Sequence, residues 1–357
     1  MTRAARHEAT FPPSLNGVAA RVERRIDGLL DRELMRWQTV DPALAEPLGS
    51  LRDFVAMGGK RLRPAFCFCA FIGAGGDPHD ERVIDAAAAL ELVHTFALVH
   101  DDVMDGSDTR RGSDAVHRHF VRRHGAARWR GEGRRFGEGM AILVGDFAIV
   151  YADLLMRDVV SDAREVYDEL RVELCVGQSL DLIGTASANT EPALAHRIAT
   201  FKSGKYTVER PLHLGAALAG RRSALAPSLS AIGLPLGQAF QLRDDILGAF
   251  GDADVIGKPV GDDLREGKPT PLVAAAYAAA STGDRAVLAR LGAADFTVDD
   301  VHALRNVFVQ SGALDEIEDE IGRLVTEARA AIETAPLTGE ARERLDELAV
   351  YVAWRDR

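Results

Sequence analysis

The sequence is poor in cysteine, which limits the kind of protein it can encode. The 357-residue chain has three cysteines, Cys67, Cys69 and Cys175. They form no Cys-x-x-Cys motif and cannot all pair, so a disulfide framework is not indicated. We therefore expect three small buried residues in a protein of a reducing compartment.

The sequence also gives no sign of a membrane anchor, a signal peptide or a linker. The opening residues MTRAARHEATFPP have no apolar core, and no stretch rich in Pro, Ser or charge divides the chain. The longest apolar stretch, residues 140–156, is interrupted by Asp146 and Asp153, which favours a buried helix over a membrane span. A net charge of −11 argues against nucleic acid or an anionic membrane surface as the main partner. We expect a cytoplasmic protein without a transmembrane segment.

Strict alternation of polar and apolar residues is absent, so a sheet is not expected. Alanine- and leucine-rich segments with apolar residues three and four apart recur instead. They predict helices over residues 15–37, 64–73, 80–105, 139–160, 162–184, 192–220, 228–249, 271–280, 298–309, 313–334 and 339–353. Many helices with short connections predict one all-α bundle, whose sites are built by side chains on facing helices.

Two segments are predicted to be non-helical. Residues 125–137, GAARWRGEGRRFG, form a Gly/Arg-rich stretch that we expect to be a mobile loop. Residues 251–269 form a loop punctuated by glycines. We also expect residues 1–13 to be flexible, within a single all-α domain that spans residues 1–357.

Lysine is scarce, because only five of the 43 basic residues are lysines. Lysine and arginine are not interchangeable at a phosphate or in a tight pocket, so a retained lysine points to a need for a compact ammonium group. All five lie in short glycine-containing segments: Lys60, Lys202, Lys205, Lys258 and Lys268.

Three carboxylates gather at the end of the apolar segment LELVHTFALVHDDVMD. On a helix, Asp101, Asp102 and Asp105 fall within an arc of about 100°. Such carboxylates repel one another unless a cation lies among them, and Mg²⁺ is the hard cation that shares its coordination with phosphates. The alternative is a solvated helix end with ordinary surface aspartates.

A second acidic pair, Asp244 and Asp245, lies within the apolar segment FQLRDDILGA. Two carboxylate clusters on separate buried helices are difficult to explain by solubility alone. If they face each other across a bundle, they would hold metal ions around one anionic group from both sides.

Four basic segments accompany the two acidic clusters. Glycines in GGKRLRP let the backbone approach an anion closely, and the segment supplies three cations. Two substrates that each carry a diphosphate would explain the number of basic segments, whereas a salt-bridge network is the alternative. The cations concerned are Lys60, Arg61, Arg63, Arg110, Arg111, Lys202, Lys205, Lys258 and Lys268.

These motifs resemble those of the polyprenyl synthetases, the trans-isoprenyl diphosphate synthases, over roughly residues 51–271. The match covers GGKRxRP, DDxxD followed by RRG, the lysine segment, QLxDD and the KxxGxD loop. The resemblance implies a bundle of about ten or more helices around a central cavity, and a homodimer. The sequence resembles a short-chain bacterial enzyme similar to geranylgeranyl or farnesyl diphosphate synthases.

The resemblance also implies a role for each matching residue. About three Mg²⁺ ions, or Mn²⁺, would be held by Asp101, Asp102, Asp105, Asp244 and Asp245. Isopentenyl diphosphate would be bound by Lys60, Arg63, His94 and Arg111. The allylic diphosphate would be bound by Arg110, Lys202, Ser203, Gln241, Lys258 and Lys268.

One position departs from the family pattern. The second acidic motif of the family usually ends in a third aspartate, and here Gly248 stands at that position. Asp252 could substitute through water, or two carboxylates could suffice. On charge grounds the third aspartate is the most dispensable, so activity is still expected.

The implied reaction joins isopentenyl diphosphate to an allylic primer (dimethylallyl, geranyl or farnesyl diphosphate) after the allylic C–O bond ionises. Product length would depend on Phe96, five residues before Asp101, and on Ala97 after it. Two aromatic residues at these places typically give farnesyl diphosphate, whereas one allows geranylgeranyl diphosphate. We therefore expect geranylgeranyl diphosphate, with farnesyl diphosphate as the alternative. Phe96 could equally be an ordinary core residue.

Two other functions share part of this pattern. A class I terpene cyclase also uses an acidic helix and Mg²⁺, but it has no isopentenyl diphosphate to bind and would lack GGKRLRP. A non-catalytic subunit that modulates a true synthase would typically have lost aspartates from its metal motifs. Gly248 is the one hint of such a loss.

Overall fold

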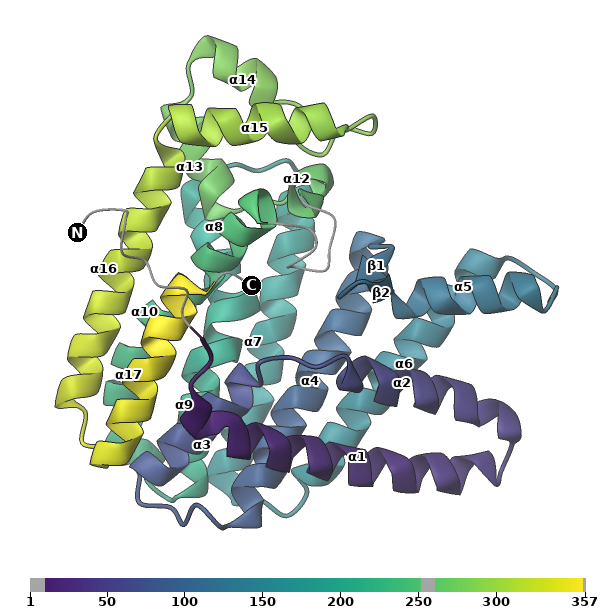
Figure 1. The fold of residues 1–357 in the computed structure, drawn as a ribbon, viewed down its shortest axis with the longest axis vertical. Coiled ribbons are helices and arrows are strands. Elements are labelled where there is room, and N and C mark those ends of the chain that lie inside the picture. Colours follow the sequence, from purple (N-terminus) through teal and green to yellow (C-terminus); the bar gives the residue numbers. More distant parts are fainter. Residues whose placement is uncertain (1–9, 252–260, 356–357) are drawn as a thin grey trace. The chain divides into compact units, whose positions relative to one another are not determined.

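The computed structural model describes residues 10–251 and 261–355, and the predicted all-α class is confirmed (Figure 1). The described residues contain one small exception, an antiparallel hairpin of two-residue strands. It pairs β1 (Thr109–Arg110) with β2 (Ser113–Asp114). Asp252 and Lys258 lie outside the described residues, as do most of the first 13 residues.

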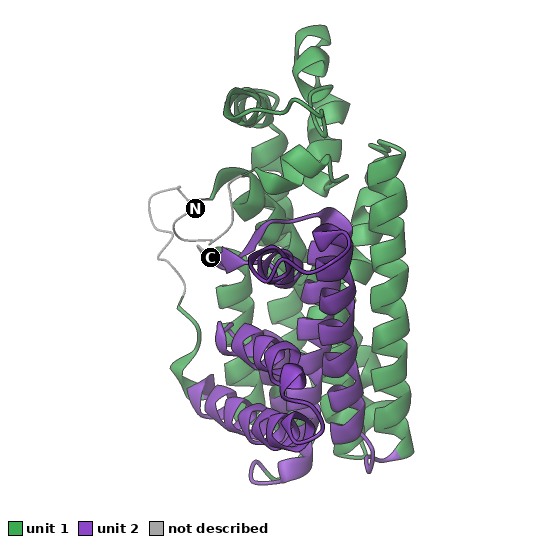
Figure 2. Ribbon diagram, turned by 90° about the vertical axis from the view of Figure 1, so that its right-hand side faces the viewer, with its two compact units in different colours: residues 1–14, 69–77, 161–357 green, residues 15–68, 78–160 purple. Residues whose placement is uncertain are grey.

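The chain divides into two compact units, which Figure 2 shows in separate colours. Unit 1 comprises residues 1–14, 69–77 and 161–357, and unit 2 comprises residues 15–68 and 78–160. Helix α3 (Leu62–Gly73) contributes residues to both. The organisation of residues 1–357 as a single domain stays a prediction.

Unit 2 is built around helix α4 (Glu81–Asp105), which packs against the four other helices that lie wholly within the unit. Residues 86–89, four successive alanines, are fully buried, so neighbouring helices meet α4 on all sides. The surrounding elements are α1 (Asn16–Gln38), the short η3 (Pro42–Leu44), α2 (Ala45–Ala56), α5 (Val116–Ala126) and α6 (Gly133–Leu155).

Both ends of α4 are fixed by local chemistry. The Asp80 side chain accepts a hydrogen bond from Arg82 N at 2.8 Å, and Gly106 ends the helix in the left-handed conformation at φ 68°. By length and composition, α4 is the one described helix that could cross a membrane, but 67% of its most apolar window is buried. Such burial is typical of a core helix.

Unit 1 is organised around helix α10 (Arg222–Phe250), which packs against η4 and α16 above all. Its other elements are η2 (Pro13–Leu15, which ends in unit 2), α7 (Ser161–Ala186), α8 (Pro192–Ile198), η4 (Ala199–Glu209), α9 (Arg210–Leu218), α12 (Asp262–Glu266), α13 (Pro271–Ala279), α14 (Thr282–Leu288), α15 (Val298–Gln310), α16 (Ala313–Thr334) and α17 (Gly339–Trp354).

Three differences from the predicted helices have physical causes. The helix expected over residues 192–220 is interrupted by η4, a π-helix of 11 residues, which periodicity cannot reveal. Helix α5 was not predicted because two of its four buried residues are histidines, His117 and His124. The Gly/Arg-rich stretch is non-helical only over residues 127–132, because α6 begins at Gly133 rather than after residue 137.

The expectation for the cysteines was right at two positions and wrong at the third. Cys67 and Cys69 are buried in α3, whereas Cys175 is exposed on α7. The sequence around Cys175, with its apolar neighbours, gave no sign that this face of the helix is uncovered.

Candidate active site

Unit 2 gathers two of the four basic segments around one histidine. Burial lowers the pKa of His94 well below its usual value, and the positive charges of four nearby arginines lower it further. These arginines are Arg63, Arg111, Arg110 and Arg61. The structure thus brings GGKRLRP, the RRG segment and His94 of α4 together, as an anion site requires.

Within GGKRLRP, Arg61 has a structural role. It is 4% exposed and donates hydrogen bonds to Glu91 and, at 3.0 Å, to Val55 O. A further hydrogen bond of 3.3 Å reaches Glu23. These partners neutralise the guanidinium and fix the segment between α2 and α3, where Arg61 adopts a left-handed φ of 49°.

Arg111 folds back onto the glycines of the same segment. Its Nη1 donates to Gly58 O, and its Nη2 lies 3.2 Å from where a Cβ on Gly59 would be. A side chain at residue 59 would therefore crowd the guanidinium. The glycine pair predicted to allow close approach of an anion also allows close approach of Arg111.

The acidic end of α4 is linked to the RRG segment by Arg110. Asp102 is 1% exposed and accepts hydrogen bonds from Arg110 Nε at 3.0 and 3.2 Å, while Asp101 Oδ2 lies 3.8 Å from Arg110 Nη2. Burial acts to lower the pKa of Arg110, but the charge and hydrogen bonds of Asp102, together with the charges of Asp101 and Asp105, outweigh it and the pKa is raised. Asp101 and Asp105, one turn apart, share a face of α4.

Phe96, the predicted length-determining residue, is partly buried and contacts His100. The two rings meet edge to face with centroids 4.6 Å apart. A ring nitrogen of His100, Nε2, lies 2.9 Å from Ile142 O, and it would be 2.3 Å from a Cβ on Gly145. Helix α6 thus fixes His100, and His100 fixes one side of Phe96. Ala97 is also partly buried.

The second acidic cluster lies in unit 1 around Asp245, which is 6% exposed. Its Oδ1 accepts a hydrogen bond from Gln241 at 2.7 Å, and its buried Oδ2 has no hydrogen-bond partner within the described residues. Burial raises the pKa of Asp245 well above its usual value, although the bond from Gln241 opposes the rise. Three further carboxylates raise it: Asp263, Asp244 and Asp181.

Lys202 is held in this cluster by Asp181, which sequence analysis missed. Lys202 Nζ lies 2.5 Å from Asp181 Oδ2, and Asp181 is 4% exposed on α7. A Cβ on Gly177 would lie 2.2 Å from Lys202 N, so α7 and η4 meet backbone to backbone. The one sign of Asp181 in the sequence is that a charged residue interrupts the otherwise apolar segment SLDLIG. Ser203 follows Lys202 in η4.

Arg355 was also missed, because it follows its partner by 111 residues. It is 4% exposed, donates to Asp244 and to Phe240 O at 3.1 Å, and covers the Phe240 ring at 4.2 Å. No pattern in the sequence places this arginine beside the second acidic motif.

Lys268 lies in the same unit, with Nζ 2.7 Å from Glu266 Oε2 and 3.7 Å from Asp263 Oδ1. Lys258, predicted to bind the same diphosphate, lies outside the described residues. Some predicted site residues thus lie together within a unit: His94 with Arg63, Arg110 and Arg111, and Gln241 with Asp244 and Asp245.

The donor set fits Mg²⁺. The unpartnered, buried oxygen of Asp245 and the mutual repulsion of its neighbouring carboxylates both favour a bound cation. Among the described residues, no group of three or more His, Cys, Asp or Glu side chains could hold a metal by itself. Mg²⁺ commonly uses one or two carboxylates and completes its shell with water and substrate phosphates, so these clusters suit metal that arrives with a diphosphate.

Comparisons with known proteins agree with this chemistry. The geranylgeranyl pyrophosphate synthase of Corynebacterium glutamicum, solved with isoprenyl diphosphate and magnesium, superposes with a TM-score of 0.91 and 35% identity over 96% of this chain and 99% of that one. The geranylfarnesyl diphosphate synthase of Aeropyrum pernix is 31% identical over 92% of this chain and 99% of its own. The geranylgeranyl diphosphate synthase of Methanosarcina mazei is 32% identical over 82% and 87%.

The family model described as polyprenyl synthetase matches residues 46–308, which include both acidic clusters and all the basic segments. The chain belongs to the polyprenyl synthetase family.

Proposed function

We propose that this protein is a Mg²⁺-dependent prenyltransferase that elongates allylic diphosphates with isopentenyl diphosphate. One observation carries the proposal: in unit 2, an acidic helix end lies next to four arginines that surround a neutral histidine. Binding a diphosphate together with Mg²⁺ requires carboxylates that can hold the metal and, beside them, cations that can hold the phosphate groups.

In unit 2, Asp101 and Asp105 would bind metal, because they share a face of α4 at its C-terminal end. Asp102 would do so less directly, since Arg110 occupies both of its oxygens. Arg110 would in turn bind the allylic diphosphate. Isopentenyl diphosphate would be bound by Lys60, Arg63, His94 and Arg111.

In unit 1, Asp244 and Asp245 would bind metal, and metal binding by Asp244 would compete with Arg355. Lys202, oriented by Asp181, would bind the allylic leaving group with Ser203, Gln241 and Lys268. Lys258 belongs to the same proposal from the sequence. That both acidic clusters act on one diphosphate stays a prediction.

The reaction breaks the allylic C–O bond and releases diphosphate, and the double bond of isopentenyl diphosphate then forms the new C–C bond. Bound Mg²⁺ would neutralise the leaving diphosphate and favour its departure. Lys202 and Arg110 would stabilise the same charge through hydrogen bonds. The proton lost at the end would pass to the released diphosphate, so no covalent intermediate with the protein is needed.

The product we propose is geranylgeranyl diphosphate, with farnesyl diphosphate as the alternative. Phe96 is supported on one side by His100, and Ala97 offers little bulk beside it. Replacing the ring should remove the wall against which the growing chain ends. Phe96→Ala should therefore shift products to longer chains, measured by chromatography of dephosphorylated products. An unchanged product distribution would contradict this role for Phe96.

The function itself is tested with purified protein, Mg²⁺, labelled isopentenyl diphosphate and each primer: dimethylallyl, geranyl or farnesyl diphosphate. The expected result is elongation to geranylgeranyl diphosphate, abolished by EDTA and restored by excess Mg²⁺ or Mn²⁺. Absence of elongation with every primer would favour the non-catalytic subunit instead.

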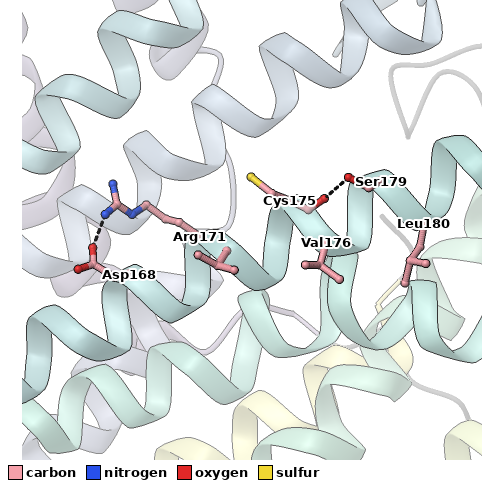
Figure 3. Close-up of a pocket in the computed structure, with 7 residues that line it drawn as sticks. Asp168, Arg171, Cys175, Val176, Ser179 and Leu180 are labelled. Atoms are coloured by element: carbon pink, nitrogen blue, oxygen red, sulfur yellow. Dashed lines mark hydrogen bonds and ion pairs between the residues drawn. The ribbon is translucent and has the colours of Figure 1, made fainter.

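We further propose that the protein is a cytoplasmic homodimer, as the family resemblance implies. The support is an apolar stripe exposed along α7 in unit 1, which includes Val172, Val176 and Ile183 at 60%, 44% and 63% exposure. A shallow groove runs along part of this face, past Cys175 (Figure 3). An exposed free thiol is also consistent with a reducing compartment.

A further inference from the structure

Lys205 is the one described lysine of the basic segments to which the proposed function gives no role. It lies in η4, three residues after Lys202 in the segment FKSGKY, and its side chain is 15% exposed. Burying a charge is costly unless the charge is paired and hydrogen-bonded. The partners of Lys205 therefore indicate what this lysine does.

Helix α7 presents one stripe of residues to η4. Glu173, Gly177 and Asp181 are spaced four residues apart, so they lie on one face of the helix. Lys205 Nζ donates to Glu173 at one end of the stripe, and Lys202 Nζ lies 2.5 Å from Asp181 at the other. Between them, a Cβ on Gly177 would lie 2.2 Å from Lys202 N, so the two backbones are in contact. The π-helix is therefore attached to α7 by two ion pairs and one backbone contact.

The two ion pairs of this stripe differ in how firmly they are held. Glu173 is 6% exposed and accepts hydrogen bonds of 2.6 and 2.7 Å from Arg210, in addition to the one from Lys205. Burial acts to raise the pKa of Glu173, but the hydrogen bonds from Arg210 and Lys205 outweigh it, and the pKa is lowered. An ionised carboxylate with this many bonds is a fixed anchor, whereas Lys202 is 21% exposed and can be reached by a ligand.

The same end of η4 is also anchored to α10. Glu209, the last residue of η4, is 4% exposed and accepts a hydrogen bond of 2.7 Å from Ser230 of α10. Its Oε2 lies 3.8 Å from Lys205 Nζ. Buried charges thus fix the C-terminal half of η4 to two helices, while the N-terminal half carries Lys202. A π-helix is a rare conformation, so its hydrogen-bond register depends on such tertiary support.

We propose that Lys205 is a positioning residue, whose ion pair with Glu173 fixes η4 along α7 so that the neighbouring turn presents Lys202 to the diphosphate. The inference rests on the proposed function for the role of Lys202 as a ligand of the leaving group. Lys205 itself does not contact the diphosphate. A lysine suits this place because its compact ammonium group fits between Glu173 and Glu209, where Arg210 already supplies a planar guanidinium.

The scarcity of lysine makes the assignment measurable in the wild type. Lysine isotopically labelled at Cε gives five NMR signals, one for each lysine, and Lys202→Arg and Lys205→Arg each identify one signal by its loss. When inorganic diphosphate and Mg²⁺ are added, the Lys202 signal should move and the Lys205 signal should stay in place. A Lys205 signal that moves as far as that of Lys202 would overturn the inference, because Lys205 would then be a ligand itself.

Lys205→Met removes the charge and keeps the apolar stem of the side chain. It should weaken the binding of inorganic diphosphate about tenfold and shift the Lys202 signal of the free protein, because the turn that carries Lys202 loses its anchor. The variant should still fold, since Arg210 continues to neutralise Glu173. A loss of stability alone would leave the Lys202 signal unchanged at temperatures where the variant is folded.

Arg222→Met is the matched control. It removes an ion pair of 2.9 Å with Glu165, which lies on the same face of α7 but eight residues before Glu173. Diphosphate affinity and the Lys202 signal should both stay as in the wild type, because Arg222 belongs to α10 rather than to η4.

Wild-type affinity together with an unmoved Lys202 signal in Lys205→Met would overturn the inference. The titration of the wild type tests it even where Lys205→Met is unstable. Diphosphate binding that depends on Lys205, in a protein that elongates no primer, would overturn only the proposed function. A Lys202 signal that does not respond to diphosphate in the wild type would contradict both.

Discussion

Single residues of the same type have different roles here according to what surrounds them. Arg61 is buried and paired with Glu91, so its main role is to anchor the loop before α3. Arg63 and Arg111 contribute more than Arg61 to the positive potential that lowers the pKa of His94. Likewise Asp102 is engaged by Arg110, whereas Asp245 keeps an unpartnered oxygen. Burial and pairing, rather than membership in a motif, separate anchoring residues from candidate ligands.

At the residue scale, His94 should make stability depend on pH. Its folded pKa lies well below the unfolded value near 6.5, so below pH 6.5 the unfolded chain binds a proton that the folded protein does not. Stability from this residue is therefore complete above pH 6.5 and decreases as pH falls, by at most about 1.4 kcal/mol per pH unit.

His94→Gln should flatten this slope, measured as the free energy of unfolding in urea between pH 7.5 and about pH 5.5. His117 and His213 also have lowered pKa values, so part of the slope should remain in the variant. Equal slopes for the two proteins would show that His94 is not held neutral in the folded state.

At the element scale, glycines set the distance between helices of unit 1. Gly177 places α7 against η4, and a Cβ on Gly237 of α10 would lie 2.5 Å from Gly204 O of η4. Backbones can approach this closely only without side chains. The π-helix that carries Lys202 and Ser203 is thus held between two helices by glycine contacts. These contacts fix the position of Lys202 relative to Asp181, with which it forms an ion pair.

Gly177→Ala should disturb this packing and displace Lys202. We expect a loss of about 1–3 kcal/mol in the free energy of unfolding, together with weaker binding of inorganic diphosphate. Gly322→Ala is the matched control, because nothing lies within 4 Å of a Cβ there in α16. It should stabilise the protein by roughly 0.5–1 kcal/mol through helix propensity. Similar effects of both substitutions would contradict the contact between α7 and η4.

At the scale of the whole molecule, the exposed stripe of α7 predicts the state of assembly. The wild type should sediment at twice the 38.5 kDa mass of the chain, and Val176→Glu/Ile183→Glu should shift it to the single mass by placing charge in the interface. Val298→Glu, on an exposed valine at the start of α15, is the control and should leave the mass unchanged. A wild-type monomer would refute the proposed dimer.

The sequence predicted most long helices because their apolar residues repeat with helical spacing, and α1 and α16 are examples. It failed at α5, where buried histidines replace apolar residues, and at η4, where the hydrogen-bond register changes without a compositional signal. Its site residues were found by motif, which explains why Asp181 and Arg355, outside every motif, were missed.

The sequence by itself determined the helical class, the family and the chemical types gathered for metal and diphosphate, since these depend on residue identity and short spacings. Only the tertiary structure decided that Arg61 anchors a loop, that Arg355 reaches Asp244, and that Lys205 pairs with Glu173. Such contacts join residues distant in the chain or on different elements. Their existence depends on how helices pack, and helix packing is set by the shape and burial of many side chains together.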